Sequence, residues 1–132
     1  MIDHDTKTKI EKSSEIVVHS AIEVHRNLGP GLLERAYEQC LLHEISNKEA
    51  SIKNQVGIPL KYKGITLDCG FRADMIVNDH LLVEIKSVAT ITEIHMAQAI
   101  TYLKISGIRL CLILNFNCKL MKEGIRRVVL DF

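Results

Sequence analysis

The stretch FRADMIVNDHLLVEIK, residues 71–86, decides the fold. Two apolar runs flank Asn78-Asp79-His80, a strong turn signal, so the stretch predicts two consecutive antiparallel strands. A three-residue turn pairs Val77 with Leu81, whereas a two-residue turn would shift the register by one residue. We expect the three-residue turn.

This register brings charged side chains together across the two strands. Asp74 then lies opposite Glu84 and Arg72 opposite Lys86, and Glu84 and Lys86 share one face because strand side chains alternate. Two facing carboxylates destabilise a sheet, and a divalent cation such as Mg²⁺ removes that conflict. Lys86 could then orient an attacking water or stabilise charge that builds on phosphorus. The alternative is an ordinary solvated face of salt bridges.

The rest of the chain predicts an α/β (α+β) domain with the order ααβββαββ. Apolar periodicity indicates helices and strands, and Lys63-Gly64 is a turn signal. The order contains no linker or repeat, so residues 1–132 form one domain. The expected helices cover residues 9–28, 32–45 and 92–106, and the expected strands cover 52–62, 65–77 with a break near Cys69-Gly70, 81–88, 109–116 and 126–132.

The second expected helix carries an acidic residue on its apolar side. At 100° per residue, Glu34 falls inside the apolar arc, so we expect its carboxylate to be partly buried. A buried carboxylate is costly unless it is paired or binds metal. A Glu satisfied by Arg or Tyr is the alternative. The arc consists of Leu33, Ala36, Tyr37, Cys40, Leu41 and Ile45.

The third expected helix carries a polar stripe of His95, Gln98 and Tyr102 at positions i, i+3 and i+7. Gln98 and Tyr102 could bond a phosphate or hold metal ligands in place. A solvated helix surface gives the same pattern.

The composition indicates a cytoplasmic globular protein. The N-terminal residues are charged where a signal peptide would be apolar, and no apolar run is long enough to span a membrane. The four cysteines match no zinc spacing and are expected to be free buried thiols. A net charge of +1 counts mildly against a nucleic-acid binder.

Several motifs in this order resemble one family. Residues 31–37, GLLERAY, fit the GxxExxY signature, so the chain is similar to the GxxExxY proteins, a branch of the PD-(D/E)XK nuclease superfamily. The resemblance runs from about His25 to Val129. It continues through Asp74, Glu84-Ile85-Lys86, the Gln98 and Tyr102 pair, and Leu114-Asn115-Phe116.

The resemblance implies a restriction-endonuclease-like fold and a set of site residues. The implied αβββαβ core is a mixed sheet flanked by helices, here with an extra N-terminal helix. Ala73 stands where many members have a Pro before the Asp. The implied metal ligands are Glu34, Asp74 and Glu84, the implied catalytic residues are Asp74, Glu84 and Lys86, and the supporting or substrate-binding candidates are Gln98, Tyr102, Tyr37, Arg72 and His95.

The expected activity is that of a Mg²⁺- or Mn²⁺-dependent endonuclease without an organic cofactor, acting on DNA rather than RNA. A homodimer is also expected, because a compact nuclease domain often needs a second copy to engage a duplex, and Ile94 and Ile105 lie off the main helix stripe. The competing hypothesis is a catalytically silent module that uses the fold for binding. Absence of metal binding and a co-purifying partner protein would favour it.

Overall fold

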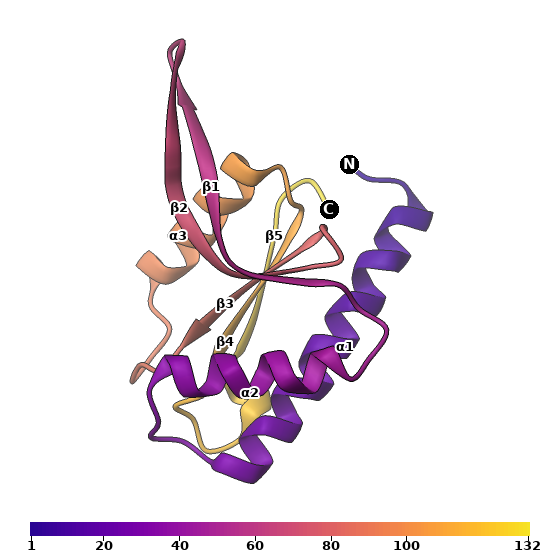
Figure 1. The fold of residues 1–132 in the computed structure, drawn as a ribbon, viewed down its shortest axis with the longest axis vertical. Helices are drawn as coiled ribbons and strands as arrows, with labels where there is room; N and C mark the ends of the chain where they lie inside the picture. Colours follow the sequence, from indigo (N-terminus) through magenta and orange to yellow (C-terminus); the bar gives the residue numbers. More distant parts are fainter.

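A computed structural model describes all 132 residues and shows a five-stranded mixed sheet with helices on both faces (Figure 1). The expected ααβββαββ order is confirmed, with a short 3₁₀ helix, η1, added before the last strand. The elements are α1 His4–Leu28, α2 Glu34–Ser46, β1 Ile52–Tyr62, β2 Ile65–Val77, β3 Leu81–Lys86, α3 Glu93–Ser106, β4 Leu110–Asn115, η1 Met121–Gly124 and β5 Ile125–Val129.

The strands lie in the order β1-β2-β3-β4-β5, and β3 and β4 form the only parallel pair. Parallel neighbours need a long crossover connection, which α3 supplies between them. All six β4 residues are buried, as expected for a strand covered on both faces.

Two hydrophobic clusters lie on opposite faces of the sheet. The larger cluster packs α1 and α2 against one face and includes Val83 and Ile85 of β3. The smaller cluster packs α3 against the other face and includes Leu82. The alternation predicted for β3 is therefore present.

The helix ends correct two expected boundaries. α1 begins at His4, earlier than the expected residue 9, because the Asp3 side chain accepts a hydrogen bond from Thr6 N at 2.8 Å and caps the helix. α2 begins at Glu34 and not at Leu32, because Leu33 still has an extended backbone. α3 ends at the expected residue 106, where Gly107 caps it in the left-handed conformation.

Strands β1 and β2 form a long ribbon that projects from the body (Figure 1). The predicted turn at Lys63 and Gly64 is confirmed by their positive φ values of 45° and 85°. β2 is continuous through the expected break, but its ladder with β1 is irregular there. Pro59 of β1 lies at this irregularity, and edge strands and bulges are where a sheet accommodates proline.

Two further expectations need correction. All four cysteines are free, but only Cys111 is buried and Cys69 is exposed, because Cys69 lies on the projecting ribbon. β5 ends at Val129 and not at Phe132. None of the helices combines the length and the apolar character that crossing a membrane requires.

Candidate active site

The hairpin of β2 and β3 brings two carboxylates together. Val77 pairs with Leu81, which confirms the three-residue turn. The backbone pairing of β2 and β3 ends at Met75 and Val83, and at Asp74 and Glu84 the two strands are joined by hydrogen bonds between side chains and backbone. Asp74 N donates to Glu84 Oε2 at 3.2 Å, and Ile85 N donates to Asp74 Oδ2 at 2.8 Å. The two carboxylates therefore lie side by side where the strands separate.

Glu84 is buried on the α3 face of the sheet, with 6% of its surface exposed. Burial, followed by repulsion from the Asp74 carboxylate, raises the pKa of Glu84 to about 8. Lys86 lowers the same pKa, but its effect is the smallest of those acting on Glu84. Ionising both carboxylates is therefore costly in the metal-free protein, and Lys86 does not offset that cost.

The ion pairs of the structure do not involve this cluster. They join Lys9 to Asp5, Arg26 to Glu23, Lys53 to Asp79 and Arg127 to Glu11. Arg72, which was expected opposite Lys86, donates from Nη1 to the Gln55 carbonyl at 2.9 Å. A face of ordinary salt bridges therefore does not describe these carboxylates.

Lys86 ends β3, where an asparagine of β4 fixes the segment that follows. Lys86 is half-buried and pairs with Asn115 in the parallel ladder. The buried Asn115 side chain bonds both backbone groups of Val88, accepting from its N at 3.1 Å and donating to its O at 2.9 Å. The sequence singled out Asn115 only as part of a motif, and the structure gives it this holding role.

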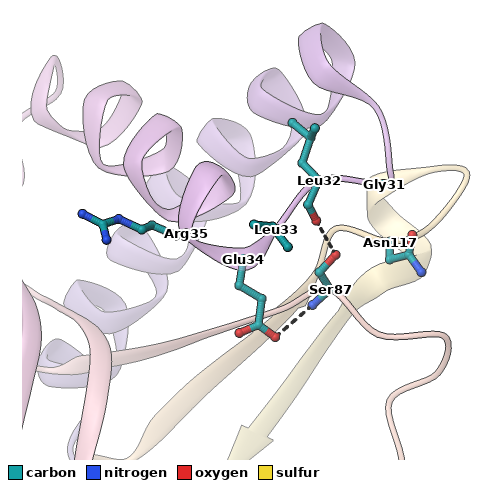
Figure 2. Close-up of a pocket in the computed structure, with 7 residues that line it drawn as sticks. All are labelled: Gly31, Leu32, Leu33, Glu34, Arg35, Ser87 and Asn117. Atoms are coloured by element: carbon teal, nitrogen blue, oxygen red, sulfur yellow. Dashed lines mark hydrogen bonds between the residues drawn. The ribbon is translucent and has the colours of Figure 1, made fainter.

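Glu34 is exposed, and the expectation that it would be partly buried is wrong. The apolar arc was drawn as if the helix continued before and after Glu34. Glu34 is the first residue of α2, so no helical turn precedes it and its side chain is open to solvent. Its Oε1 accepts from Ser87 N at 3.3 Å, and Ser87 Oγ donates to Leu32 O at 2.8 Å. Figure 2 shows these two contacts joining the start of α2 to the end of β3.

An open pocket of about 640 Å³ lies at this junction (Figure 2). Glu34 and Ser87 line it, whereas Asp74 and Glu84 do not. The structure assembles no group of three His, Cys, Asp or Glu side chains that could hold a metal. Of the three expected ligands, Asp74 and Glu84 are brought together, whereas Glu34 contacts Ser87 after the end of β3 and does not join them.

Comparison with protein families adds one decisive observation. A sequence model described as the PD-(D/E)XK nuclease superfamily matches residues 11–128. The chain belongs to the PD-(D/E)XK nuclease superfamily. No match was found among characterised proteins or among solved structures. The mixed sheet with its additional N-terminal helix agrees with the restriction-endonuclease-like fold of this superfamily.

Helix α3 brings Tyr102 near the carboxylates of Asp74 and Glu84. Its ring stacks on Phe71 of β2, with 3.8 Å between centroids. Burial, then the charges of Glu84 and Asp74, raise the pKa of Tyr102, and a contact with Gln98 opposes them. Tyr102 and Gln98 therefore lie on the face of α3 that borders the site.

His95 has a structural contact at the start of α3. Its Nδ1 accepts from Thr92 N at 3.0 Å, and Thr92 Oγ1 accepts from His95 N at 3.4 Å. This capping box fixes the helix start. The stripe predicted on α3 thus divides into a capping residue, His95, and the contacting residues Tyr102 and Gln98, of which Tyr102 lies near the carboxylates.

Tyr37 supports the loop that precedes Glu34. It is fully buried, and its ring stacks on Phe116 with 4.5 Å between centroids. Its hydroxyl donates to Gly29 O at 2.6 Å and accepts from Leu32 N at 3.1 Å. Both hydrogen bonds of the hydroxyl go to backbone, so Tyr37 holds the loop between α1 and α2.

Sequence reasoning missed two residues beside Asp74. Gln55 Nε2 donates to Glu38 Oε1 at 2.8 Å and lies 3.5 Å from Asp74 Oδ1. Glu38 is buried, with 8% of its surface exposed. One signal was present, because Glu38 lies one turn after Glu34, just beyond the edge of the apolar arc.

Proposed function

We propose that the protein is a divalent-metal-dependent nuclease that hydrolyses phosphodiester bonds in DNA. The observation that carries the proposal is the pair formed by half-buried Asp74 and buried Glu84, which has no cationic partner at ion-pair distance. The GLLERAY motif supports placing the chain with the GxxExxY branch.

The donor set fits Mg²⁺ or Mn²⁺. Both side chains offer hard oxygen atoms, and Mg²⁺ is commonly held by one or two carboxylates together with waters and substrate phosphate. Asp74 and Glu84 would hold the metal, and Glu34 would border it from α2. The metal supplies Lewis-acid stabilisation of the phosphoryl oxygens and lowers the pKa of bound water.

Lys86 is the residue we assign to the reacting phosphate. Its ammonium lies on the same strand face as Glu84, and a positioned cation stabilises the charge that develops on phosphorus. Tyr102 and Gln98 offer a hydroxyl and an amide on the neighbouring helix face, where they can bond a phosphate oxygen. Ser87 and Asn115 keep the chain after Lys86 in place.

The test is cleavage of DNA and RNA with Mn²⁺ by the wild type and by Glu84→Gln and Lys86→Ala. We expect each variant to lose at least about 100-fold in rate, the scale of losing one electrostatic contact at a reacting centre. Glu93→Gln and Lys104→Ala are matched controls at exposed positions of α3 and should cleave like the wild type.

Two outcomes would contradict the proposal. Equal cleavage by the wild type and both site variants would show that the activity comes from elsewhere. A wild type that neither cleaves nucleic acid nor binds Mn²⁺ in calorimetry would favour the silent binding module.

A further inference from the structure

Gln55 contacts two acidic side chains from an unusual backbone position. Its φ is 51°, in the left-handed region that a non-glycine strand residue rarely adopts. Its Nε2 donates to both Glu38 oxygens at 2.8 and 3.1 Å and lies 3.5 Å from Asp74 Oδ1. The amide therefore sits between a carboxylate of α2 and a carboxylate of β2.

Side chains two residues apart on β2 pack on opposite faces of the sheet at this point. Met75 of β2 packs in the cluster under α1 and α2, whereas Ala73, two residues away, packs in the cluster under α3. Residues two apart on a regular strand share a face, so the ribbon is irregular at Asp74. Gln55 lies on the partner strand at the same level, and Arg72 holds its carbonyl at 2.9 Å.

Glu38 anchors the Gln55 amide. Its buried carboxylate has Gln55 as its only hydrogen-bond partner, and a buried carboxylate is costly without such a bond. The contact therefore stabilises Glu38 and immobilises the amide. Because α2 carries Glu38, the position of the amide depends on the helix that also carries Glu34.

The Asp74 carboxylate is held at both oxygen atoms. Ile85 N donates to Oδ2 at 2.8 Å, and the Gln55 amide approaches Oδ1. A neutral amide orients a carboxylate without cancelling its charge, whereas Lys or Arg at the same place would compete with a cation. The full charge of Asp74 stays available.

We propose that Gln55, anchored by Glu38, is a positioning residue that orients the Asp74 carboxylate for metal binding. The inference rests on the proposed function, since it gives Asp74 a metal to bind. Gln55 acts through Asp74 and touches neither substrate nor metal.

The decisive variant is Gln55→Gly, which deletes the amide and suits the positive φ. Gln55 is exposed, so the core is untouched. We expect Mn²⁺ affinity to fall about 10- to 100-fold in calorimetry, the usual range for residues that orient metal ligands. We also expect a lower kcat with an unchanged KM for DNA. In the metal-free protein the glycine relieves the positive φ but leaves the buried Glu38 carboxylate without its hydrogen-bond partner, so we expect a lower free energy of unfolding.

Matched variants separate positioning from folding. Asn54→Gly places the same substitution one residue away and should bind Mn²⁺ like the wild type, as should Gln39→Ala beside Glu38. Glu38→Ala should weaken Mn²⁺ binding as Gln55→Gly does. Glu38→Gln keeps an acceptor for the amide and should recover part of that loss.

The outcomes are distinguishable. A wild type that binds Mn²⁺ and a Gln55→Gly variant with the same affinity and kcat would overturn the positioning role and leave the proposed function standing. A wild type that neither binds Mn²⁺ nor cleaves would overturn both.

Discussion

The two faces of the sheet differ in how completely helices cover them. On one face, α1 and α2 close over a cluster of 17 buried residues. On the other, α3 alone covers a cluster of nine, and Glu84 lies beside it. The first face carries most of the core, whereas Glu84 of the acidic pair is buried on the second.

The largest expected effect on the free energy of unfolding comes from truncating one core side chain on each face of the sheet. Leu114 and Ile113 are neighbours on β4, fully or almost fully buried on opposite faces. We expect Leu114→Ala and Ile113→Ala each to lower the free energy of unfolding by about 2–5 kcal/mol. Leu114→Ala should cost more, because a single helix can move into a cavity more easily than a pair of packed helices.

Urea unfolding of the two variants measures this difference. A larger loss for Ile113→Ala would show that the α3 face is packed as rigidly as the other face, and the contrast between the two faces would then fail.

The second effect concerns the charge on the α3 face. The folded-state pKa of Glu84, about 8, lies above its ordinary value of 4.5. Unfolding therefore releases a proton between these pH values, and the free energy of unfolding of the metal-free protein should fall as the pH rises from 4.5 to 8. The fall should be on the order of a few kcal/mol.

Glu84→Gln removes the titrating group and should flatten this part of the pH profile. The difference between wild type and variant isolates Glu84 from other titrating groups such as His80, whose pKa burial lowers. Urea unfolding at pH 5, 6, 7 and 8 measures both profiles. Parallel profiles would mean that folding does not raise the pKa of Glu84.

The smallest effect compares two tyrosine hydroxyls. Tyr37→Phe leaves Gly29 O and Leu32 N without their buried partner and should cost about 1 kcal/mol of unfolding free energy. Tyr102→Phe on the α3 face should cost less, because its hydroxyl is not bonded to backbone. Equal losses in urea unfolding would indicate that Tyr102 also supports the fold.

The parts of the fold that were predictable depend on local patterns. The turn after Val77 set the strand register, and Gly107 set the end of α3, because each depends on a few neighbouring residues. Strand alternation placed Glu84 and Val83 on opposite faces, which identified the acidic pair with Asp74.

The parts that were not predictable depend on where regular structure stops. Glu34 was assigned to a buried arc, but the angle of a residue around the helix axis does not predict its burial when it lies in the first turn. Gln55 looks like any polar residue of an alternating strand, and its positive φ arises only in the folded ribbon. Its contact with Glu38 joins elements that the sequence does not pair.

The irregular edge of the sheet has a consequence for association between molecules. β1 is an edge strand, and an exposed edge can pair with a strand of another chain and start aggregation. The positive φ of Gln55 and the missing N–H group of Pro59 leave only residues 56–58 as a regular stretch between them. At the opposite edge, β5 is short and exposes Arg126 and Arg127. Both edges are therefore poor templates for growth of a fibril, although the ribbon projects far into solvent.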